Sequence, residues 1–548
     1  MNASVHTLEP LVDIADLHVS FAGQAVVQGV SLQLRQGQCV ALVGESGSGK
    51  SVTSRTLAGL TGAGAVVQAR RLRFAGHDLS QLGQTAWQRL RGGQIGFVMQ
   101  DALGSLDPLR RVGWQIEQPL WLHTRQGDEA RRQRVLELLR EVGVPEPELR
   151  AQQYPWQLSG GLRQRALIAS AIACRPKLLI ADEPTTALDA TVQAQILDLL
   201  EHLRGSDNAL LMVSHDLAVV SRLADWVVVM QDGAVVEQGP TEQVLLDPRQ
   251  PYTRMLLQAA RAVHFQRGTA PRGPAPASIP QVAPVLEARA LGKVFNGPDG
   301  QPRTVLRNVN LRLHAGQTLG VVGESGSGKS TLGRLLLGLE RPDQGEVWLD
   351  GQAWSSLAPQ AQRLARRGIA VVFQDPQASF DPRYTVARVL EEALGEAGVP
   401  RAQRRARALA LLERVHLPAR LLGRRPLELS GGQRQRVAIA RALAVSPKVL
   451  VCDEPVSALD VTVQAHILQL LAELKQSLGL ACLFISHDLG VIEQISDQVL
   501  VLKDGQVVEQ GATARVLGAP RHAYTRALLD AVPVLPAPVP AWFSRIAV

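Results

Sequence analysis

The octapeptide Gly-Glu-Ser-Gly-Ser-Gly-Lys-Ser occurs twice in this 548-residue chain, at residues 44–51 and again at residues 323–330. An apolar run typical of a strand precedes each copy, and a segment typical of a helix follows it. The predicted strands are 39–43 and 318–322, and the predicted helices are 52–60 and 331–339. A chain that carries this strand, loop and helix twice must fold each copy around the same tight glycine-rich turn.

Glycines, a lysine and a hydroxyl at this spacing are typical of a phosphate-binding P-loop. Its backbone N–H groups surround the β-phosphate, its lysine reaches the β- and γ-phosphate oxygens, and its serine hydroxyl ligates Mg²⁺. The N-terminus of the following helix also favours anions. A glycine-rich turn that only resembles this pattern is the alternative, and the strand and helix context, present twice, argues against it. The predicted loop residues are Gly44, Glu45, Ser46, Gly47, Ser48, Gly49, Lys50 and Ser51, and Gly323, Glu324, Ser325, Gly326, Ser327, Gly328, Lys329 and Ser330.

The second half of the chain repeats the first, motif by motif and in the same order. The matched positions are Gln100 and Gln374, Ser159 and Ser430, Asp182 and Asp453, His215 and His487, and Tyr252 and Tyr524. We therefore predict two domains, 1–259 and 285–548, joined by a linker at 260–284 that is rich in Pro, Gly and Ala. Strand-like runs alternate with helical segments in each half, which favours an α/β fold with a mainly parallel sheet. The segments 103–154 and 378–427 predict helical insertions on that fold.

Composition is that of an ordinary globular protein, with 46% hydrophobic and 20% charged residues. No stretch approaches the roughly 18 consecutive apolar residues of a membrane span, and the first residues lack the order of a signal peptide, so we expect a cytoplasmic protein.

Cys39, Cys174, Cys452 and Cys482 stand singly, without the paired spacing of a zinc or redox site, and we expect buried, reduced thiols. The net charge of +8 is expected chiefly to favour solubility.

Two further segments narrow the choice among kinases, GTPases and other ATPases. Residues 158–165 read Leu-Ser-Gly-Gly-Leu-Arg-Gln-Arg, and residues 429–436 read Leu-Ser-Gly-Gly-Gln-Arg-Gln-Arg. Each precedes an apolar strand that ends in Asp-Glu-Pro, at 182–184 or 453–455. These segments resemble the signature and Walker B sequences of the ABC ATPase family. The resemblance implies two tandem P-loop ABC ATPase domains, each with a RecA-like, mainly parallel sheet core, an antiparallel β subdomain and a helical subdomain.

Paired carboxylates at the end of a buried strand can divide the work of ATP hydrolysis. The first can hold Mg²⁺ through water, and the second can point to the attacking water. Asp182 and Asp453 take the first role, and Glu183 and Glu454 take the second. An acidic turn after a strand is the alternative, which the P-loop and signature in the same register disfavour.

Ser-Gly-Gly before a helix offers a hydroxyl, close backbone approach and a positive helix end, which together can hold a γ-phosphate. Such a turn alone is more often a helix cap. In the ABC family this motif contacts the ATP held by the opposite domain, so the resemblance implies two composite sites. In the first, residues 44–51 face Ser430, Gly431 and Gly432, and in the second, residues 323–330 face Ser159, Gly160 and Gly161. Leu162 stands where the commonest signature has a glutamine, as at Gln433, and we still expect both sites to hydrolyse ATP.

The resemblance also assigns roles to residues that would be unremarkable alone. His215 and His487 resemble the switch histidine that contacts the γ-phosphate. Phe21 and Phe295 lie upstream of the P-loops, where the family stacks an aromatic ring on adenine, and a phenylalanine of the strand core is the alternative. Gln100 and Gln374 resemble the glutamine that touches Mg²⁺ and water. The implied Mg²⁺ residues are thus Ser51, Gln100 and Asp182, and Ser330, Gln374 and Asp453.

A short tail follows each predicted domain, with Pro-Tyr-Thr-Arg at 251–254 and Ala-Tyr-Thr-Arg at 523–526. These tails resemble those of the ATPase subunits of dipeptide, oligopeptide and nickel importers, here in the fused form of the microcin C or glutathione importer type. The resemblance implies an ATP-hydrolysing subunit that energises import of peptides or related small solutes at the cytoplasmic face of the inner membrane. The implied partners are two permease subunits and an extracytoplasmic solute-binding protein.

The alternative function is that of a soluble tandem ABC ATPase acting on the ribosome or on nucleic acid. Ribosome-type members typically join their domains by a long charged helix, whereas the join here is short and rich in Pro and Gly. DNA-repair members carry zinc cysteine pairs, which this sequence lacks. We therefore expect no nucleic-acid partner, and the importer-like tails disfavour export.

Overall fold

The computed structural model describes residues 9–186, 188–204, 208–265, 283–296, 301–457 and 459–536. The chain forms two compact units, here called the N-terminal unit, mainly residues 1–260, and the C-terminal unit, mainly residues 261–532. Residues 266–282, which make up most of the predicted linker, lie outside the described residues. The exact domain limits therefore stay a prediction.

A six-stranded sheet in the order β11-β10-β3-β9-β8-β7 forms the centre of the N-terminal unit. Its strands are β3 (Cys39–Val43), β7 (Ile95–Val98), β8 (Leu178–Asp182), β9 (Ala209–Val213), β10 (Trp226–Gln231) and β11 (Ala234–Pro240). Only β11 runs antiparallel to its neighbour; the other five strands are parallel. Every residue of β3, β8 and β9 is buried, as expected of continuous apolar strands covered on both faces.

A second, antiparallel sheet follows the order β2-β1-β5-β6, with β4 paired to β1. Its strands are β1 (Val12–Phe21), β2 (Gln24–Leu34), β4 (Ala65–Gln68), β5 (Arg71–Phe74) and β6 (His77–Asp78). Apolar side chains of this sheet, such as Ile14 and Phe74, form one core with Leu42 of β3 and with Leu57, which follows the P-loop. The P-loop is thereby fixed between two sheets.

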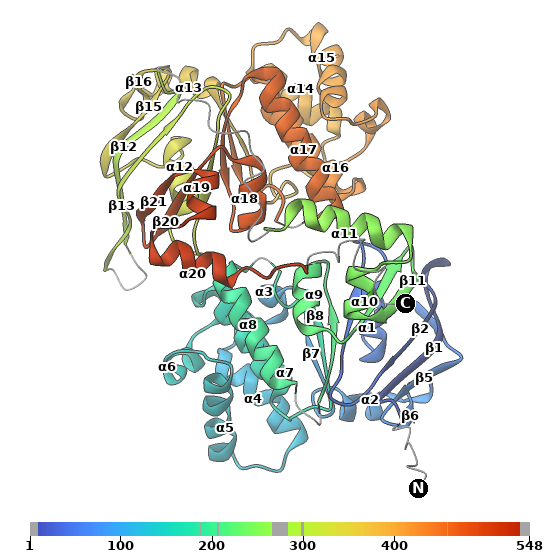
Figure 1. The fold of residues 1–548 in the computed structure, drawn as a ribbon. Helices are drawn as coiled ribbons and strands as arrows, with labels where there is room; N and C mark the ends of the chain where they lie inside the picture. The colour runs from blue at the N-terminus through green and yellow to red at the C-terminus, as the bar shows by residue number, and fades with distance from the viewer. Residues whose placement is uncertain are drawn as a thin grey trace, which may run out of the picture. The chain divides into compact units, whose positions relative to one another are not determined.

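Helices cover the rest of the N-terminal unit. They are α1 (Lys50–Leu57), α2 (Gln84–Leu90), α3 (Ala102–Ser105), α4 (Val112–His123), α5 (Asp128–Glu141), α6 (Pro147–Gln152), α7 (Gly160–Ile172), α8 (Ala190–Leu203), α9 (Leu217–Leu223), α10 (Thr241–Leu246) and α11 (Pro251–Val263). Helices α4, α5, α6 and α7 pack on one another and gather on the side of the central sheet away from the antiparallel sheet (Figure 1). The predicted helical insertion at 103–154 is confirmed.

The C-terminal unit repeats this architecture. Its central sheet has the order β17-β18-β19-β14-β20-β21 and its antiparallel sheet the order β13-β12-β15-β16. The strands are β12 (Leu286–Asn296), β13 (Pro302–Leu313), β14 (Thr318–Val322), β15 (Gln344–Leu349), β16 (Gln352–Ala353), β17 (Ile369–Val372), β18 (Val449–Asp453), β19 (Ala481–Ile485), β20 (Gln498–Lys503) and β21 (Gln506–Ala512). The helices are α12 (Lys329–Leu336), α13 (Pro359–Ala365), α14 (Val386–Glu396), α15 (Arg401–Arg414), α16 (Gly431–Leu443), α17 (Val461–Leu478), α18 (Leu489–Ile495), α19 (Thr513–Gly518) and α20 (Ala523–Ala531). The predicted fold, two tandem α/β domains with a central sheet, an antiparallel sheet and a helical part, is confirmed.

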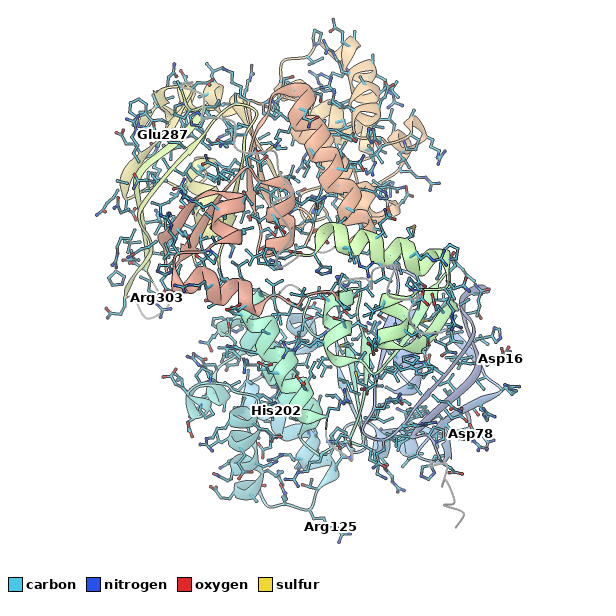
Figure 2. All side chains as sticks on the ribbon, in the orientation of Figure 1. Asp16, Asp78, Arg125, His202, Glu287 and Arg303 are labelled. Atoms are coloured by element: carbon cyan, nitrogen blue, oxygen red, sulfur yellow. The ribbon has the colours of Figure 1, made fainter. Side chains whose placement is uncertain are left out.

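Charged side chains project from both units, for example Arg125 between α4 and α5 and Asp78 on β6 (Figure 2). Some of them are paired: Glu287 of β12 accepts hydrogen bonds from Arg289 Nη2 of the same strand at 2.6 Å and from Arg312 Nε of the neighbouring strand β13 at 2.9 Å. Among the described residues, none of the helices combines the length and the apolar character needed to cross a bilayer.

The four cysteines are free thiols. Cys39, Cys452 and Cys482 are buried as predicted, whereas Cys174 is only half-buried and its Sγ lies 3.4 Å from the carbonyl oxygen of Pro119. Burial raises the pKa of Cys39 to about 12, so this thiol stays protonated.

Candidate nucleotide sites

The two P-loops connect β3 to α1 and β14 to α12. Their first glycines leave no room for a side chain: a Cβ on Gly44 would lie 2.2 Å from the carbonyl oxygen of Met230, and one on Gly323 would lie 2.1 Å from that of Leu502. Both glycines also adopt positive φ angles, 146° and 153°, which L side chains rarely adopt. The sheet therefore dictates glycine where each loop begins.

Lys50 and Lys329 are the first residues of α1 and α12. Both side chains are buried, with 6% of each residue exposed. Each Nζ donates to the carbonyl oxygens of the first two residues of its own loop, at 2.7 or 2.8 Å. Burial lowers the pKa of Lys329, and the charge of Glu454 opposes that shift. The ammonium groups are thus held against the loops that are predicted to surround phosphate.

A serine hydroxyl meets the strand-end aspartate. Ser51 Oγ donates to Asp182 Oδ1 at 2.8 Å, while Oδ2 of the same carboxylate is buried, accepts no hydrogen bond and lies 3.5 Å from Arg55 Nη2. Asp453 Oδ1 is likewise buried without one. Burial raises the pKa of both aspartates. A hydroxyl and a carboxylate oxygen that accepts no hydrogen bond are the hard oxygen donors that Mg²⁺ takes, so these residues fit a magnesium ion.

Glu183, the residue after Asp182, receives hydrogen bonds from three side chains. His215 Nδ1 lies 3.1 Å from Oε1, Gln100 Nε2 donates to Oε2 at 2.7 Å, and Thr186 Oγ1 donates to Oε2 at 3.0 Å. The structure therefore brings together three of the residues predicted from separate motifs, on the loops that follow β7, β8 and β9. These loops meet because the carboxyl ends of parallel strands lie at one edge of a sheet.

The C-terminal unit repeats this cluster. His487 Nδ1 lies 3.1 Å from Glu454 Oε1, and Gln374 Nε2 donates to Glu454 Oε2 at 2.9 Å. In each unit, burial alone would raise the pKa of the glutamate, but the hydrogen bond and charge of the histidine lower it below its usual value. Burial would likewise lower the pKa of His215 and His487, and the paired glutamate raises it instead. In each cluster the histidine and the glutamate therefore stabilise each other's charged forms, and the lowered pKa keeps the glutamate ionised.

Both glutamates have unusual backbone conformations. Glu183 has a φ of 50° and Glu454 a φ of 48°, in the left-handed region that residues other than glycine seldom occupy. Their backbone N–H groups donate to Val213 O and Ile485 O, each at 2.9 Å, which holds them beside the neighbouring strand. Matched residues outside the site, such as Asp232 and Asp504, also have positive φ angles of 49° and 46°, so the conformation is a property of the shared fold.

The Ser-Gly-Gly motifs stand at helix N-termini. Ser159 and Ser430 are the N-caps of α7 and α16, and each Oγ accepts from the N–H three residues on, at 3.4 and 3.3 Å. The N–H of Ser430 donates to Gln433 Oε1 at 3.1 Å, whereas the Leu162 side chain has no acceptor for the N–H of Ser159. The substitution at Leu162 thus removes half of a capping box and leaves the serine cap in place.

The second glycine of each motif is packed against a neighbouring helix. A Cβ on Gly161 would lie 2.5 Å from Val192 Cγ1 of α8, and one on Gly432 would lie 2.5 Å from Val463 Cγ1 of α17. The first glycines, Gly160 and Gly431, have more room behind them. Helix packing therefore explains the second glycine of each pair, whereas a Cβ on the first would make only ordinary contacts.

The two upstream phenylalanines differ in their surroundings. Phe21, at the end of β1, packs against the core between the two sheets of the N-terminal unit. Phe295 is 37% exposed and has Lys293 Nζ 5.2 Å from the centre of its ring. Adenine stacking by either ring stays a prediction.

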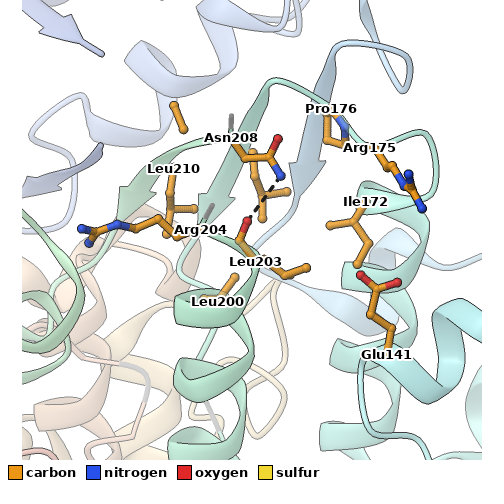
Figure 3. Close-up of a pocket in the computed structure, with 11 residues that line it drawn as sticks. Glu141, Ile172, Arg175, Pro176, Leu200, Leu203, Arg204, Asn208 and Leu210 are labelled. Atoms are coloured by element: carbon orange, nitrogen blue, oxygen red, sulfur yellow. Dashed lines mark hydrogen bonds between the residues drawn. The ribbon is translucent and has the colours of Figure 1, made fainter. Parts of the chain in front are cut away.

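Two hollows in the N-terminal unit contain none of the predicted site residues. One, of about 50 Å³, is lined by apolar side chains such as Ile172 and Leu200 together with Glu141, Arg175 and Arg204, and Asn208 in its lining donates from Nδ2 to Leu203 O at 3.4 Å (Figure 3). The other, of about 480 Å³, is lined by residues that include Arg35, Arg70, Arg71 and Trp226. The first is too small for a nucleotide.

Two contacts of the site were missed from the sequence. Arg55 Nη2 lies 3.5 Å from Asp182 Oδ2. The sequence feature that could have indicated this contact is an arginine one helical turn after the P-loop serine, present in both copies as Arg55 and Arg334. The second contact comes from the tails: the hydroxyls of Tyr252 and Tyr524 accept hydrogen bonds from P-loop N–H groups.

Comparison with known proteins agrees with this geometry. The family model described as ABC transporter matches residues 27–186 and 306–457, and the model described as oligopeptide/dipeptide transporter, C-terminal region, matches residues 236–296 and 508–546. The chain is 42% identical to the glutathione import ATP-binding protein GsiA of Salmonella choleraesuis, over 96% of this chain and 90% of that protein. It is 43% identical to the peptidoglycan transport ATP-binding protein YejF of Agrobacterium fabrum, over 95% of this chain and 96% of that protein. The chain therefore belongs to the ABC transporter family, as an ATP-hydrolysing protein with two copies of the family's ATPase domain.

Proposed function

We propose that this chain binds and hydrolyses ATP to energise a membrane importer for peptides or related small solutes. The observation that carries the proposal is the cluster of glutamate, histidine and glutamine beside a P-loop, present in both units. Relatives that span nearly the same length are named as glutathione import and peptidoglycan transport proteins, and both tails match the oligopeptide/dipeptide region. Those names do not favour the alternative of a soluble ATPase acting on the ribosome or on nucleic acid.

In the proposed reaction a water oxygen attacks the γ-phosphorus, the bond to the ADP oxygen breaks, and the water proton passes to a base. Glu183 and Glu454 are the bases, since their lowered pKa keeps them ionised. His215 and His487 donate from Nδ1 to the glutamate, which leaves Nε2 to contact the γ-phosphate. Gln100 and Gln374 hold the other carboxylate oxygen and so fix the direction in which the base points.

Nucleotide is held by the loop residues 44–51 and 323–330, with Lys50 and Lys329 as the cations for the phosphates. Mg²⁺, when bound, neutralises charge on the β- and γ-phosphates. Ser51 and Asp182 would hold the ion in one unit and Ser330 and Asp453 in the other, with Gln100 and Gln374 near it. Phe21 and Phe295 are the proposed adenine contacts.

We further propose that each site is completed by the signature motif of the other half. The cap geometry supports this role, because Ser159 and Ser430 stand at the positive ends of thirteen-residue helices and the glycine after each is not crowded. The proposed partners are two permease subunits and an extracytoplasmic solute-binding protein, and the proposed location is the cytoplasmic face of the inner membrane.

The test is co-purification and stimulation of ATP hydrolysis. The tagged chain, produced together with its candidate permeases, is expected to sediment with membranes, to carry both permeases through purification, and to hydrolyse ATP faster when the loaded solute-binding protein is added. The Glu183→Gln, Glu454→Gln double variant is the matched control, which should bind the permeases without turnover. Stimulation by ribosomes, RNA or DNA with no effect of the permeases would refute import.

A further inference from the structure

A tyrosine of the C-terminal tail contacts the P-loop in both units. The N–H of Glu45 donates to Tyr252 Oη at 3.2 Å, and the N–H of Glu324 donates to Tyr524 Oη at 3.0 Å. The two partners are 207 positions apart in one case and 200 in the other. A contact over this sequence distance that recurs in two copies is a property of the domain and not of one loop.

The tail helices that carry these tyrosines are tied to the central sheets. Glu237 of β11 accepts from the N–H groups of Arg249 and Gln250, at 2.8 and 3.1 Å, just before α11 begins. Glu509 of β21 makes the same pair of bonds just before α20, to Arg521 N–H at 2.9 Å and to His522 N–H at 3.1 Å. A carboxylate at a helix N-terminus satisfies N–H groups that lack a partner within the helix. Each tyrosine is the second residue of its helix, so these bonds to the sheet fix the position of its backbone.

The N–H that donates to the tyrosine belongs to the second residue of the loop. The first residue of the loop is the glycine that has no room for a side chain beside the sheet. Gly44 and Gly323 fix where each loop leaves its strand. The tyrosine hydroxyl fixes the peptide that follows, and the lysine ammonium bonds the carbonyl oxygen of that same second residue. Tyr524 is 8% exposed, and burial raises its pKa to about 12, so its hydroxyl stays neutral.

We propose that Tyr252 and Tyr524 are positioning residues that hold the P-loops in their phosphate-binding conformation, which makes each C-terminal tail a part of a nucleotide site. The inference rests on the proposed ATP function. A loop whose N–H groups already point at the phosphates loses less conformational freedom when nucleotide binds. The tail thereby acts on ATP affinity without touching the reacting atoms.

The experiment replaces both hydroxyls, in a Tyr252→Phe, Tyr524→Phe double variant of the full chain. A hydrogen bond of this type contributes on the order of a two- to tenfold change in an equilibrium constant. The KM for ATP is therefore expected to rise about two- to tenfold with kcat little changed. In the nucleotide-free protein, hydrogen exchange of peptides covering residues 39–50 and 318–329 should be faster, because the N–H groups of Glu45 and Glu324 lose their acceptor.

Tyr384→Phe is the matched control, since its hydroxyl accepts from Arg388 Nη2 at 3.4 Å and not from a P-loop. It should leave both the KM and the exchange of the two P-loop peptides unchanged. An unchanged KM and unchanged exchange in the double variant, with only a lower melting temperature, would overturn the proposal and leave the tyrosines as anchors of the tail. A wild-type chain without ATPase activity would refute the proposed function instead, and the exchange measurement would still decide the role of the tyrosines.

Discussion

The adjacent glycines of the second signature are expected to respond in opposite ways to alanine. A Cβ on Gly432 would lie 2.5 Å from Val463 Cγ1, a distance at which something must move. A Cβ on Gly431 would lie 3.4 Å from Leu459 Cδ2, which is ordinary contact. Shortening Val463 to alanine removes the crowded Cγ1 atom, and the Val463 Cβ that stays is 3.7 Å from the new methyl group. The clash at Gly432 should therefore be relieved by Val463→Ala.

The magnitude follows from packing. Crowding an extra methyl group into a packed contact costs about 1–3 kcal/mol, and replacing glycine by alanine in a helix returns about 0.5–1 kcal/mol. A change of 1 kcal/mol shifts the melting temperature of a domain of this size by about 2–4 °C. At mid-range the net cost is about 1.25 kcal/mol, so Gly432→Ala should lower the melting temperature of the C-terminal unit by about 3–5 °C, measured by calorimetry without nucleotide. Gly431→Ala should leave the melting temperature equal or slightly higher.

The double variant Gly432→Ala, Val463→Ala decides whether this contact is the cause. Its loss of unfolding free energy should be smaller than the sum of the losses in the two single variants, with a coupling free energy of about 1 kcal/mol or more. Additive effects, or equal destabilisation by Gly431→Ala and Gly432→Ala, would refute the reasoning that helix packing dictates the second glycine.

Two further predictions concern the signature and the histidine pairs. Leu162→Gln should complete the capping box of α7 and raise the melting temperature of the N-terminal unit by about 1–3 °C. Gln433→Leu should lower the melting temperature of the C-terminal unit by a similar amount. Unchanged melting temperatures in both variants would contradict a stabilising role of the capping box. Because the folded pKa of His487 is raised above 6.5, its pairing with Glu454 stabilises fully below pH 6.5 and is lost as the pH rises through the folded pKa. The loss of stability in His487→Gln should therefore be largest below pH 6.5 and shrink as the pH rises above it. A difference in stability that does not change with pH would contradict the ion pair.

The predicted strands before the P-loops match the structure residue for residue, because continuous apolar runs bounded by glycine leave little choice of limits. The helices begin at Lys50 and Lys329, two residues earlier than predicted. The preceding residues, Gly49 and Gly328, adopt left-handed backbone conformations, and each helix starts directly after its glycine. The pattern of apolar side chains gives no indication of these conformations. Such boundaries depend on backbone angles and not on apolar periodicity.

The candidate site was predictable as a set of residues and less so as a set of contacts. Glu183, His215 and Gln100 come from three motifs, and only the strand order brings the three together. The left-handed φ of Glu183 had no signal in the sequence, because glutamate rarely adopts it. The tail motif that contains Tyr252 was visible, but its contact with the P-loop depends on where α11 is attached to the sheet.

ATP turnover by Glu183→Gln, Glu454→Gln and the double variant tests most directly the claim that each unit supplies its own catalytic base. Removing a general base typically slows a reaction by about 100- to 10,000-fold. The double variant should fall by at least about 100-fold while still binding ATP, and each single variant should lose turnover at its own site. A double variant that hydrolyses ATP at close to the wild-type rate would contradict the account, and full activity in either single variant would show that its site is dispensable.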